Sequence, residues 1–455
     1  MKANLNRRKL ISRCASGIAF GSTIQSSLIS QFANALASTT NDYKALVCIN
    51  LTGGNDSFNS AIPNSASEYQ TYSNNRRNLA IPQEQLLPLI NNAGQSLNIG
   101  LAPQLTDIAQ LFNQQKLSMV ANVGNLIEPT LKSTIIDGTA NLPPFLFSHN
   151  DQQKYSHTLN NGNYSSGWAG RLSELLQSTT SNQQLAMNIS ISGDNYLQRG
   201  LQSLPYTLKN SGVNTLKAFS PSESTDFRTS RASLYRSFLN RPRENVLQQE
   251  FSNIQSKAWA LSNYVADILS SQPEINMPLM RNSDELAKSL SMVSKLLQAR
   301  EAFELKRQIF YVELPGFDTH SSQANTHPKL LQQLNSATSQ FTQTLETLGL
   351  SDNVTTFTLS EFGRTLTING TGTDHGWGGH HFVTGGAVTG GNLIGEMPSL
   401  EPGSDDDAGE GRIIPTTSFD SFTAELCRWF GLSQEDLEQL LPNSINFTTP
   451  LGLFT

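Results

Sequence analysis

Cysteine is scarce in this sequence, and long apolar runs are absent from most of it. The chain has three cysteines in 455 residues, and only Cys48 and Cys427 lie beyond the N-terminal segment. Two cysteines so far apart exclude a disulfide framework. Cys48 lies in an apolar run typical of a buried strand, where a free thiol behaves as a small hydrophobic group. No later segment has the roughly 20 apolar residues of a spanning helix, so we expect no transmembrane anchor in the mature chain.

The first 37 residues lack acidic side chains but contain five basic ones. Paired arginines at positions 7 and 8 precede a Leu-Ile pair, residues 14–29 are only weakly apolar, and residues 35–37 read Ala-Leu-Ala. This order is typical of a twin-arginine signal peptide with a small-x-small cleavage site. An ordinary secretory signal or an amphipathic helix is the alternative. We therefore expect residues 1–37 to engage the twin-arginine export machinery and the mature chain to be periplasmic or extracellular.

Basic charge is in short supply once the signal is removed. Loss of five of the 31 Lys and Arg residues leaves 26 against 37 Asp and Glu residues, a net charge of −11. Nucleic acids and anionic membranes bind basic surfaces, so neither is an expected partner.

Short apolar runs alternate with helical patterns along the mature chain. Such alternation predicts an α/β fold, with a mostly parallel sheet flanked by helices. Residues 38–455 are expected to form one domain, with a largely helical insertion at about residues 215–300. The expected strands lie near residues 44–52, 117–123, 186–191, 308–314 and 354–359, and the expected helices near 101–114, 168–176, 243–269, 283–297, 328–348, 418–430 and 433–441.

Residues with ligand chemistry follow the expected strands. Asp56 comes after the first strand in Thr-Gly-Gly-Asn-Asp-Ser, and Asp318 and His320 follow the strand at 308–314 in Gly-Phe-Asp-Thr-His. Carboxyl ends of parallel strands form the usual binding edge of such a sheet. A carboxylate and an imidazole two residues apart suit a divalent metal of the zinc, manganese or iron type. The alternatives are a turn aspartate that bonds its own backbone and a hydrogen-bonded Asp–His pair.

Two further groups follow later strands. Glu361 could ligate a metal or orient a ligating histidine, and Arg364 is a fixed cation suited to an oxyanion. Either could instead belong to a structural ion pair. The glycine-rich segment at 372–381 contains three histidines, among which Asp374 and His375 are the best-placed ligands and His380 is a reserve.

The segment Phe-Ser-His-Asn-Asp at 147–151 brings a hydroxyl, an imidazole and a carboxylate together. His149 and Asp151 are candidates for the same crevice, although lone histidines are more often structural. We expect His157 and His327 to be surface residues.

The motifs Thr-Gly-Gly-Asn-Asp, Ser-His-Asn-Asp, Gly-Trp-Ala-Gly-Arg, Phe-Asp-Thr-His, Ser-Glu-Phe-Gly-Arg-Thr, Thr-Asp-His-Gly and Gly-Arg-Ile-Ile-Pro-Thr-Thr occur in this order. In this order they resemble the exported proteins grouped as domain of unknown function 1501. That family resembles the alkaline phosphatase and sulfatase superfamily, which implies an alkaline phosphatase-like fold with a metal site at the strand ends.

The resemblance implies roles for individual residues. It makes Asp56, Asp318, His320, Asp374 and His375 metal ligands. Glu361 stands where many relatives present Asp-His, so the chain is expected to hold one ion as readily as two. Ser148 is a candidate nucleophile, with His149 and Arg364 as further catalytic candidates.

Two functions remain open at this point. One is a metal-dependent hydrolase of phosphate or sulfate esters, acting on a small molecule or a polymer. The other is a non-catalytic, metal-stabilised binding or assembly protein on the same fold. The unassigned nucleophile favours the second, and the carboxylate and histidine groups at successive strand ends favour the first.

Overall fold

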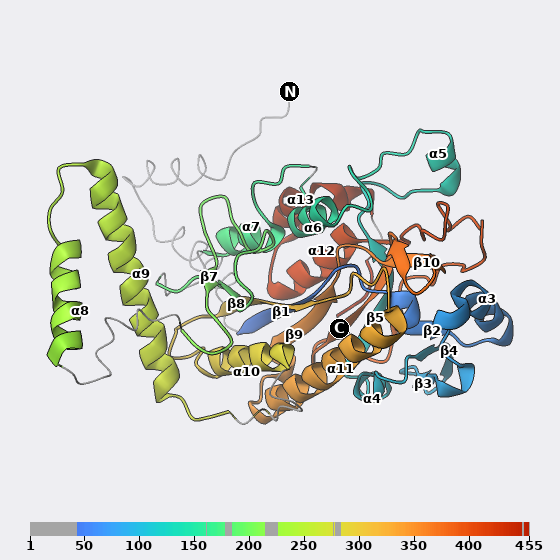
Figure 1. Ribbon diagram of the computed structural model, residues 1–455, viewed down its shortest axis with the longest axis horizontal. Coiled ribbons are helices and arrows are strands. Elements are labelled where there is room, and N and C mark those ends of the chain that lie inside the picture. The colour runs from blue at the N-terminus through green and yellow to red at the C-terminus, as the bar shows by residue number, and fades with distance from the viewer. Residues whose placement is uncertain are drawn as a thin grey trace, which may run out of the picture. The chain divides into compact units, whose positions relative to one another are not determined.

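The computed structural model describes residues 43–160, 162–177, 184–213, 226–275, 277, 284–447 and 450–454. The expected signal peptide at 1–37 lies outside these ranges. Residues 43–455 form one compact unit, with a mixed, mostly parallel sheet between layers of helices (Figure 1). The predicted fold class is therefore confirmed.

The central sheet has nine strands in the order β13-β5-β12-β9-β1-β8-β6-β7, with β14 beside β5. β1 pairs in parallel with both β8 and β9, and only β12 runs antiparallel to its neighbours. The strands are β1 (Lys44–Thr52), β5 (Leu117–Gly124), β6 (Asn188–Ser190), β7 (Tyr206–Thr207), β8 (Arg307–Pro315), β9 (Val354–Leu359), β12 (Gly379–Thr384), β13 (Leu393–Ile394) and β14 (Thr417–Ser418).

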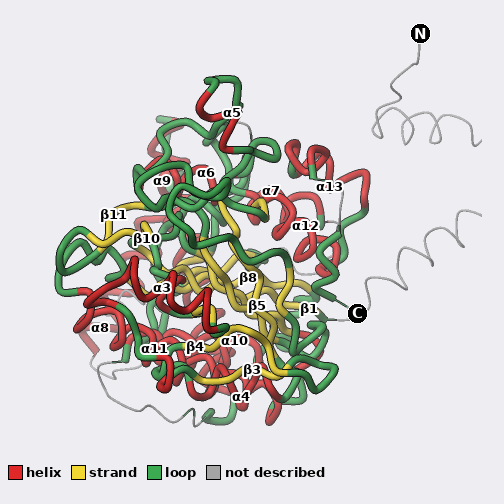
Figure 2. Tube along the Cα trace, turned by 90° about the vertical axis from the view of Figure 1, so that its right-hand side faces the viewer, coloured by secondary structure: helices red, strands yellow, loops and turns green. Residues whose placement is uncertain are grey.

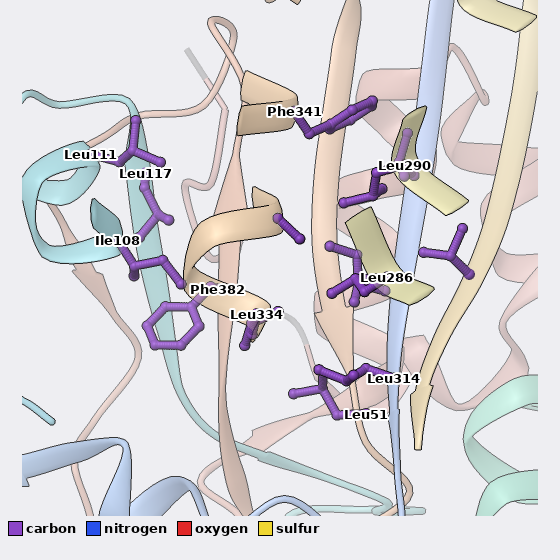
Figure 3. Close-up of a cluster of buried hydrophobic side chains, with 14 of the residues drawn as sticks. Leu51, Ile108, Leu111, Leu117, Leu286, Leu290, Leu314, Leu334, Phe341 and Phe382 are labelled. Carbon is purple, nitrogen blue, oxygen red and sulfur yellow. The ribbon is translucent and has the colours of Figure 1, made fainter. Parts of the chain in front are cut away.

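β1 is buried on both faces, which explains its largely apolar sequence. Successive side chains of a strand point to opposite faces. Accordingly Val47 and Ile49 belong to one hydrophobic core and Leu46 and Cys48 to another. The first core lies against α4, α10 and α11 and the second against α7, α12 and α13, so the sheet separates two helical layers (Figures 1 and 2). Figure 3 shows Leu51 and Leu314 with α10 and α11 side chains in the first core.

Seven of the described helices, α4, α7 and α9 to α13, match the predicted ones with shifted ends, whereas α3, α5, α6 and α8 were not predicted individually. The described helices are α3 (Ala66–Arg76), α4 (Thr106–Asn113), α5 (Lys132–Ile136), α6 (His149–Thr158), α7 (Trp168–Leu175), α8 (Asp226–Leu239), α9 (Val246–Ser271), α10 (Glu285–Gln298), α11 (Gln323–Thr347), α12 (Phe419–Phe430) and α13 (Gln434–Leu440). None of the helices in the described ranges is long and apolar enough to cross a membrane.

The region near 215–300 divides into two parts. Leu286 and Leu290 of α10 are fully buried in the first core, so α10 belongs to the helical layer on the sheet. α8 and α9 form a hairpin that stands away from the sheet (Figure 1). The helical content expected here is present, but the projecting part is shorter than residues 215–300.

Two small sheets lie beside the central one. β10 (Arg364–Ile368) and β11 (Thr373–His375) form an antiparallel pair that follows β9 in the chain. β2 (Ala61–Pro63), β4 (Ser96–Leu101) and β3 (Leu87–Ile90) form the other. The first of these places Arg364 opposite His375, so it carries two candidate site residues to one place.

Candidate metal centre

Three histidine side chains converge on one carboxylate oxygen. Asp318 Oδ1 lies 3.4 Å from His149 Nε2, 3.2 Å from His320 Nε2 and 3.5 Å from His375 Nε2. The Nε2 atoms of His320 and His375 are 2.9 Å apart. We call these four residues the Asp318 cluster. Three of its members were expected at strand ends as ligands, and His149 was expected near the same crevice.

The fold brings these residues together from distant parts of the chain. Asp318 and His320 lie in the loop after β8, His375 ends β11, and His149 is the first residue of α6. The loop after β8 begins beside β1, where the parallel strands present their carboxyl ends to one edge of the sheet. The cluster therefore occupies the position that the strand order predicts.

Each histidine of the cluster uses its other ring nitrogen for a hydrogen bond. Nδ1 of His149 lies 2.8 Å from Glu361 Oε1, and Nδ1 of His320 lies 3.1 Å from Asp374 Oδ1. Nδ1 of His375 donates to the carbonyl oxygen of Phe147 at 2.6 Å. Acceptors at Nδ1 fix the ring orientation and leave Nε2 as the ligating atom, which is the usual arrangement around metal-bound histidine.

Glu361 and Asp374 thus hold the rings of His149 and His320, whereas the resemblance had made Asp374 a ligand itself. Glu361 was open between ligating a metal and orienting a histidine, and its contact with His149 favours the second role. Its Oε1 also accepts the backbone N–H of Gly53 at 2.9 Å, and its side chain is buried. One carboxylate oxygen therefore joins the turn after β1 to the helix that carries His149.

Arg364 is part of the scaffold beneath the cluster. Its side chain is fully buried, and it donates to Asp318 Oδ1 at 2.9 Å, to the carbonyl oxygen of Gly53 at 3.3 Å and to both oxygens of Thr373. A guanidinium held in this way cannot also make the bidentate oxyanion contact expected from the sequence. Of the two roles left open for Arg364, its contact with Asp318 therefore favours the structural ion pair.

Electrostatics keep Asp318 ionised. Partial burial acts to raise the pKa of Asp318, but the hydrogen bond and charge of Arg364 outweigh it and hold this pKa below its usual value. Burial lowers the pKa of His375, whereas the hydrogen bond to Glu361 raises that of His149. The pKa shifts of Asp318 and His375 favour the ionised carboxylate and the neutral imidazole that a metal requires of its ligands, whereas the raised pKa of His149 favours its protonated ring while no metal is bound.

The distances around Asp318 Oδ1 fit those between the ligands of a metal ion, and the ligand atoms of His149, Asp318 and His375 all lie within 4.8 Å of one another. Ligand atoms about 2.0–2.1 Å from a tetrahedral zinc lie about 3.3 Å from one another. The three distances from Asp318 Oδ1 lie at 3.2–3.5 Å. In addition, His149 Nε2 is buried and has no hydrogen-bond partner among the described residues. A purely hydrogen-bonded cluster would pair such a nitrogen, whereas this one lies near the ligand atoms of Asp318 and His375.

Asp56 lies outside the Asp318 cluster. It is fully buried. Arg76 donates hydrogen bonds to its two carboxylate oxygens at 3.0 and 2.7 Å, and Gln323 donates a hydrogen bond to one of them. With both oxygens engaged by protein donors, Asp56 is not available as a ligand in this structure. The predicted ligand role is corrected to a buried ion pair. Among the described residues, the candidate position for an ion is the Asp318 cluster.

The remaining polar candidates are engaged elsewhere. Ser148 donates its hydroxyl to Asp151 at 2.6 Å within the first turn of α6, a local contact common at helix starts. His380 accepts the backbone N–H of Asn122 through Nδ1 and is buried outside the cluster.

His157 and His327 were predicted to be surface residues, and this prediction is wrong. Both are buried, and burial lowers the pKa of His157 to about 3 and that of His327 to about 4. His327 packs on Phe317 and contacts Asn55, and His157 packs on Tyr311. Both rings are therefore neutral core residues. No local sequence signal distinguishes these two histidines from surface residues, because the helix faces that carry them become buried only when the helices pack on the sheet.

Sequence reasoning missed two partners of the site residues. The carbonyl of Phe147 holds His375, and Arg76 neutralises Asp56. A main-chain acceptor leaves no trace in the residue types. Arg76, however, follows Asp56 by only 20 residues, and its place at the end of an otherwise polar helix was the available signal.

Two solved structures are similar to this chain at low sequence identity. One is the PsFucS1 sulfatase from Pseudoalteromonas sp., with 10% identity and a TM-score of 0.35 over 92% of this chain and 73% of that one. Another is Ps i-CgsB in complex with k-i-k-neocarrahexaose, with 10% identity and a TM-score of 0.34 over 89% and 76%. Similarity at this level says nothing about the activity of this chain. No curated protein matches its sequence.

A family model, in contrast, matches almost the whole described chain. The matched residues, 43–437, run from the start of β1 into α13 and include every member of the Asp318 cluster. The chain therefore belongs to the family described as protein of unknown function (DUF1501).

Proposed function

We propose that this protein is an exported, metal-dependent hydrolase of phosphate or sulfate esters. The observation that carries the metal is the convergence of three histidine nitrogens on Asp318 Oδ1 at 3.2–3.5 Å, a distance typical of two ligands of one ion. His149, Asp318, His320 and His375 would hold one divalent ion of the zinc or manganese type. The reaction class and the export rest on the resemblance and the N-terminal motif in the sequence.

A bound divalent ion supplies Lewis-acid chemistry, lowering the pKa of coordinated water and polarising an ester oxygen. The residues of the chain prepare this position. Arg364 keeps Asp318 ionised, and Glu361, Asp374 and the Phe147 carbonyl hold the three imidazoles in place. Asp318 and His320 are about half exposed, so the cluster is open to solvent on one side. A small ester or an ester group on a polymer can reach it there.

The second candidate function is a metal-stabilised binding or assembly protein. It is favoured because Ser148 and Arg364 are both held by contacts within the protein, so the expected nucleophile and oxyanion-binding cation are not free. In that case the ion links the loop after β8 and the end of β11 to α6, and it stabilises the fold without catalysing a reaction.

Metal analysis of purified protein tests the site. We expect about one zinc or manganese per chain in the wild type. We expect at least a 100-fold weaker metal affinity in Asp318→Asn and His375→Gln, because each removes a ligand from a four-ligand site. Asp137→Asn on the exposed end of α5 is the matched carboxylate control and keeps wild-type affinity. Metal content near zero in the wild type contradicts both candidate functions.

Hydrolysis assays separate the two functions. The hydrolase predicts cleavage of generic phosphate or sulfate esters that is abolished by chelator and by Asp318→Asn. The binding protein predicts that chelator lowers the melting temperature while every ester in the panel stays intact. Cleavage that persists in Asp318→Asn and His375→Gln would show that the reaction occurs elsewhere.

A further inference from the structure

The α8–α9 hairpin exposes six large apolar side chains to solvent. They are between 47 and 80% exposed and belong to both helices: Leu234, Phe238, Val246, Leu247, Phe251 and Ile254. None of them belongs to a hydrophobic core of the described residues. A concentration of this kind on one projecting element is unusual for a soluble surface and marks an interaction site.

The two helices of the hairpin already have a contact seam of their own. Ala232 and Leu239 of α8 pack on Trp259 of α9, with Tyr235 beside them. Farther along α9, Val265 is buried in the first core and fixes the base of the hairpin. The exposed apolar side chains are therefore not needed to hold the hairpin together.

Five of the six exposed side chains lie on the same face of the hairpin, and Val246 at the start of α9 is the exception. At about 100° per residue, Leu234 and Phe238 lie roughly 110° around α8 from its seam. Leu247, Phe251 and Ile254 lie roughly 110° around α9 from its seam, in the same rotational sense. Because the two helices are antiparallel, equal rotations of the same sense bring both stripes to one side. We call this side the hairpin face.

A two-helix layer with one open apolar face is half of a four-helix bundle. The five side chains of this face present apolar surface on the order of 600 Å², close to the roughly 800 Å² per partner of a stable interface. Charges around the hairpin have both signs, with exposed Arg241 and Lys257 against Glu244 and Glu250. A membrane-binding helix would have a mainly basic polar face. Charges of both signs instead allow a surface to be complementary to itself, as a twofold interface requires.

We propose that the hairpin face binds the hairpin face of a second copy of this chain, so that the protein is a twofold-symmetric dimer held by a four-helix bundle. The cluster of metal ligands lies on other elements, so the dimer does not depend on the proposed hydrolase activity.

Sedimentation of the mature protein tests this proposal. We expect a dimer at micromolar concentration in the wild type and a monomer in the double variant Leu247→Glu, Phe251→Glu. Ile445→Glu, an equally exposed apolar position outside the hairpin, is the matched control and stays dimeric. Metal content and circular dichroism are expected to be unchanged in all three proteins, because these side chains are exposed in the monomer.

Cysteine cross-linking provides a second readout. Cys48 and Cys427 are buried, so an introduced cysteine is the accessible thiol of the described residues. Mild oxidation is expected to link Phe251→Cys or Ile254→Cys into a covalent dimer and to leave Ile445→Cys monomeric. A wild type that stays monomeric at high concentration overturns the proposal. So does a double variant that stays dimeric, or wild-type chains that bind vesicles as monomers.

Discussion

Glu361 connects two parts of the site through a single oxygen. Its Oε1 accepts from the backbone of Gly53 and from Nδ1 of His149. The backbone contact supports the fold, and the histidine contact supports the cluster. Substitutions at this one position can therefore separate the structural role of the carboxylate from its effect on metal binding.

Glu361→Gln is expected to weaken metal binding by about 10- to 100-fold with little change in stability of the metal-free protein. The amide oxygen can still accept both hydrogen bonds, but the negative charge that makes His149 a stronger ligand is lost. Glu361→Ala is expected to lower the free energy of unfolding as well, by about 1–3 kcal/mol, because Gly53 N–H is left unpaired.

Metal titration calorimetry and urea denaturation in chelator measure the two effects. Glu346→Gln, which alters an exposed ion pair with Lys116, is the control. Equal metal affinity in the wild type and Glu361→Gln would mean that His149 does not ligate through Nε2.

Residue types and strand ends were enough to expect Asp318, His320 and His375 close together, as they are in the structure, and their role as ligands stays a prediction. These signals were not enough for Asp56, whose partner Arg76 comes from α3 and whose burial depends on tertiary packing. Arg364 shows the same limit. Its type fits an oxyanion, but only the fold decides that the anion it meets is Asp318.

Among the elements, the turn after β1 is the one on which the site depends most directly. Gly53 has a φ of +118°, and a Cβ at this position would lie 2.3 Å from the backbone nitrogen of Asp318. The turn and the loop after β8 therefore approach each other as backbone against backbone. No side chain can move aside to relieve such a contact.

Gly53→Ala is expected to destabilise the protein by about 3 kcal/mol or more, since it adds a clash to an unfavourable φ. It should also weaken metal binding, because Asp318 must shift. Gly94→Ala is the matched control: Gly94 has a φ of +77° with nothing within 4 Å of a Cβ, so only strain of about 1 kcal/mol is expected. Urea denaturation compares the two. Similar losses at both positions would show that the approach of the two loops is not tight.

Apolar runs and amphipathic patterns predicted most elements of the sheet and its helical layers. β9 spans 354–359 as predicted, and α11 begins five residues before the predicted start. The limit was the region near 215–300, where one pattern covered helices with different roles. α10 and α9 are both amphipathic, and whether the apolar stripe meets the sheet or solvent depends on the chain path, which local periodicity does not contain.

At the scale of the whole molecule, one buried carboxyl group affects stability. Asp420 of α12 is fully buried, and neither oxygen makes a hydrogen bond to another described residue. Burial raises its pKa from 3.8 to about 8, and Arg171 opposes this only in part. Between about pH 4 and pH 8 the folded protein holds a proton that the unfolded chain has released. The free energy of unfolding therefore falls as the pH rises through this window.

Asp420→Asn removes this titration. Between pH 5 and pH 9 we expect the free energy of unfolding to fall by a few kcal/mol more in the wild type than in Asp420→Asn. Urea denaturation at several pH values measures the difference, with chelator present so that metal binding does not contribute. Asp137→Asn on the surface is expected to follow the wild-type curve. If the unfolding free energy of Asp420→Asn changes with pH in the same way as that of the wild type, the Asp420 carboxyl group is ionised in the folded state.

The position of β1 at the centre of the sheet has a consequence for synthesis of the chain. Both parallel neighbours of β1 come late in the sequence, the nearer one after about 250 further residues. At roughly 5–20 residues per second, a ribosome needs about 12–50 seconds to make that stretch. For this time a strand with the sequence Lys-Ala-Leu-Val-Cys-Ile-Asn-Leu-Thr has no partner on either side. Nascent chains should therefore depend on a chaperone that shields residues 44–52 until β8 leaves the ribosome.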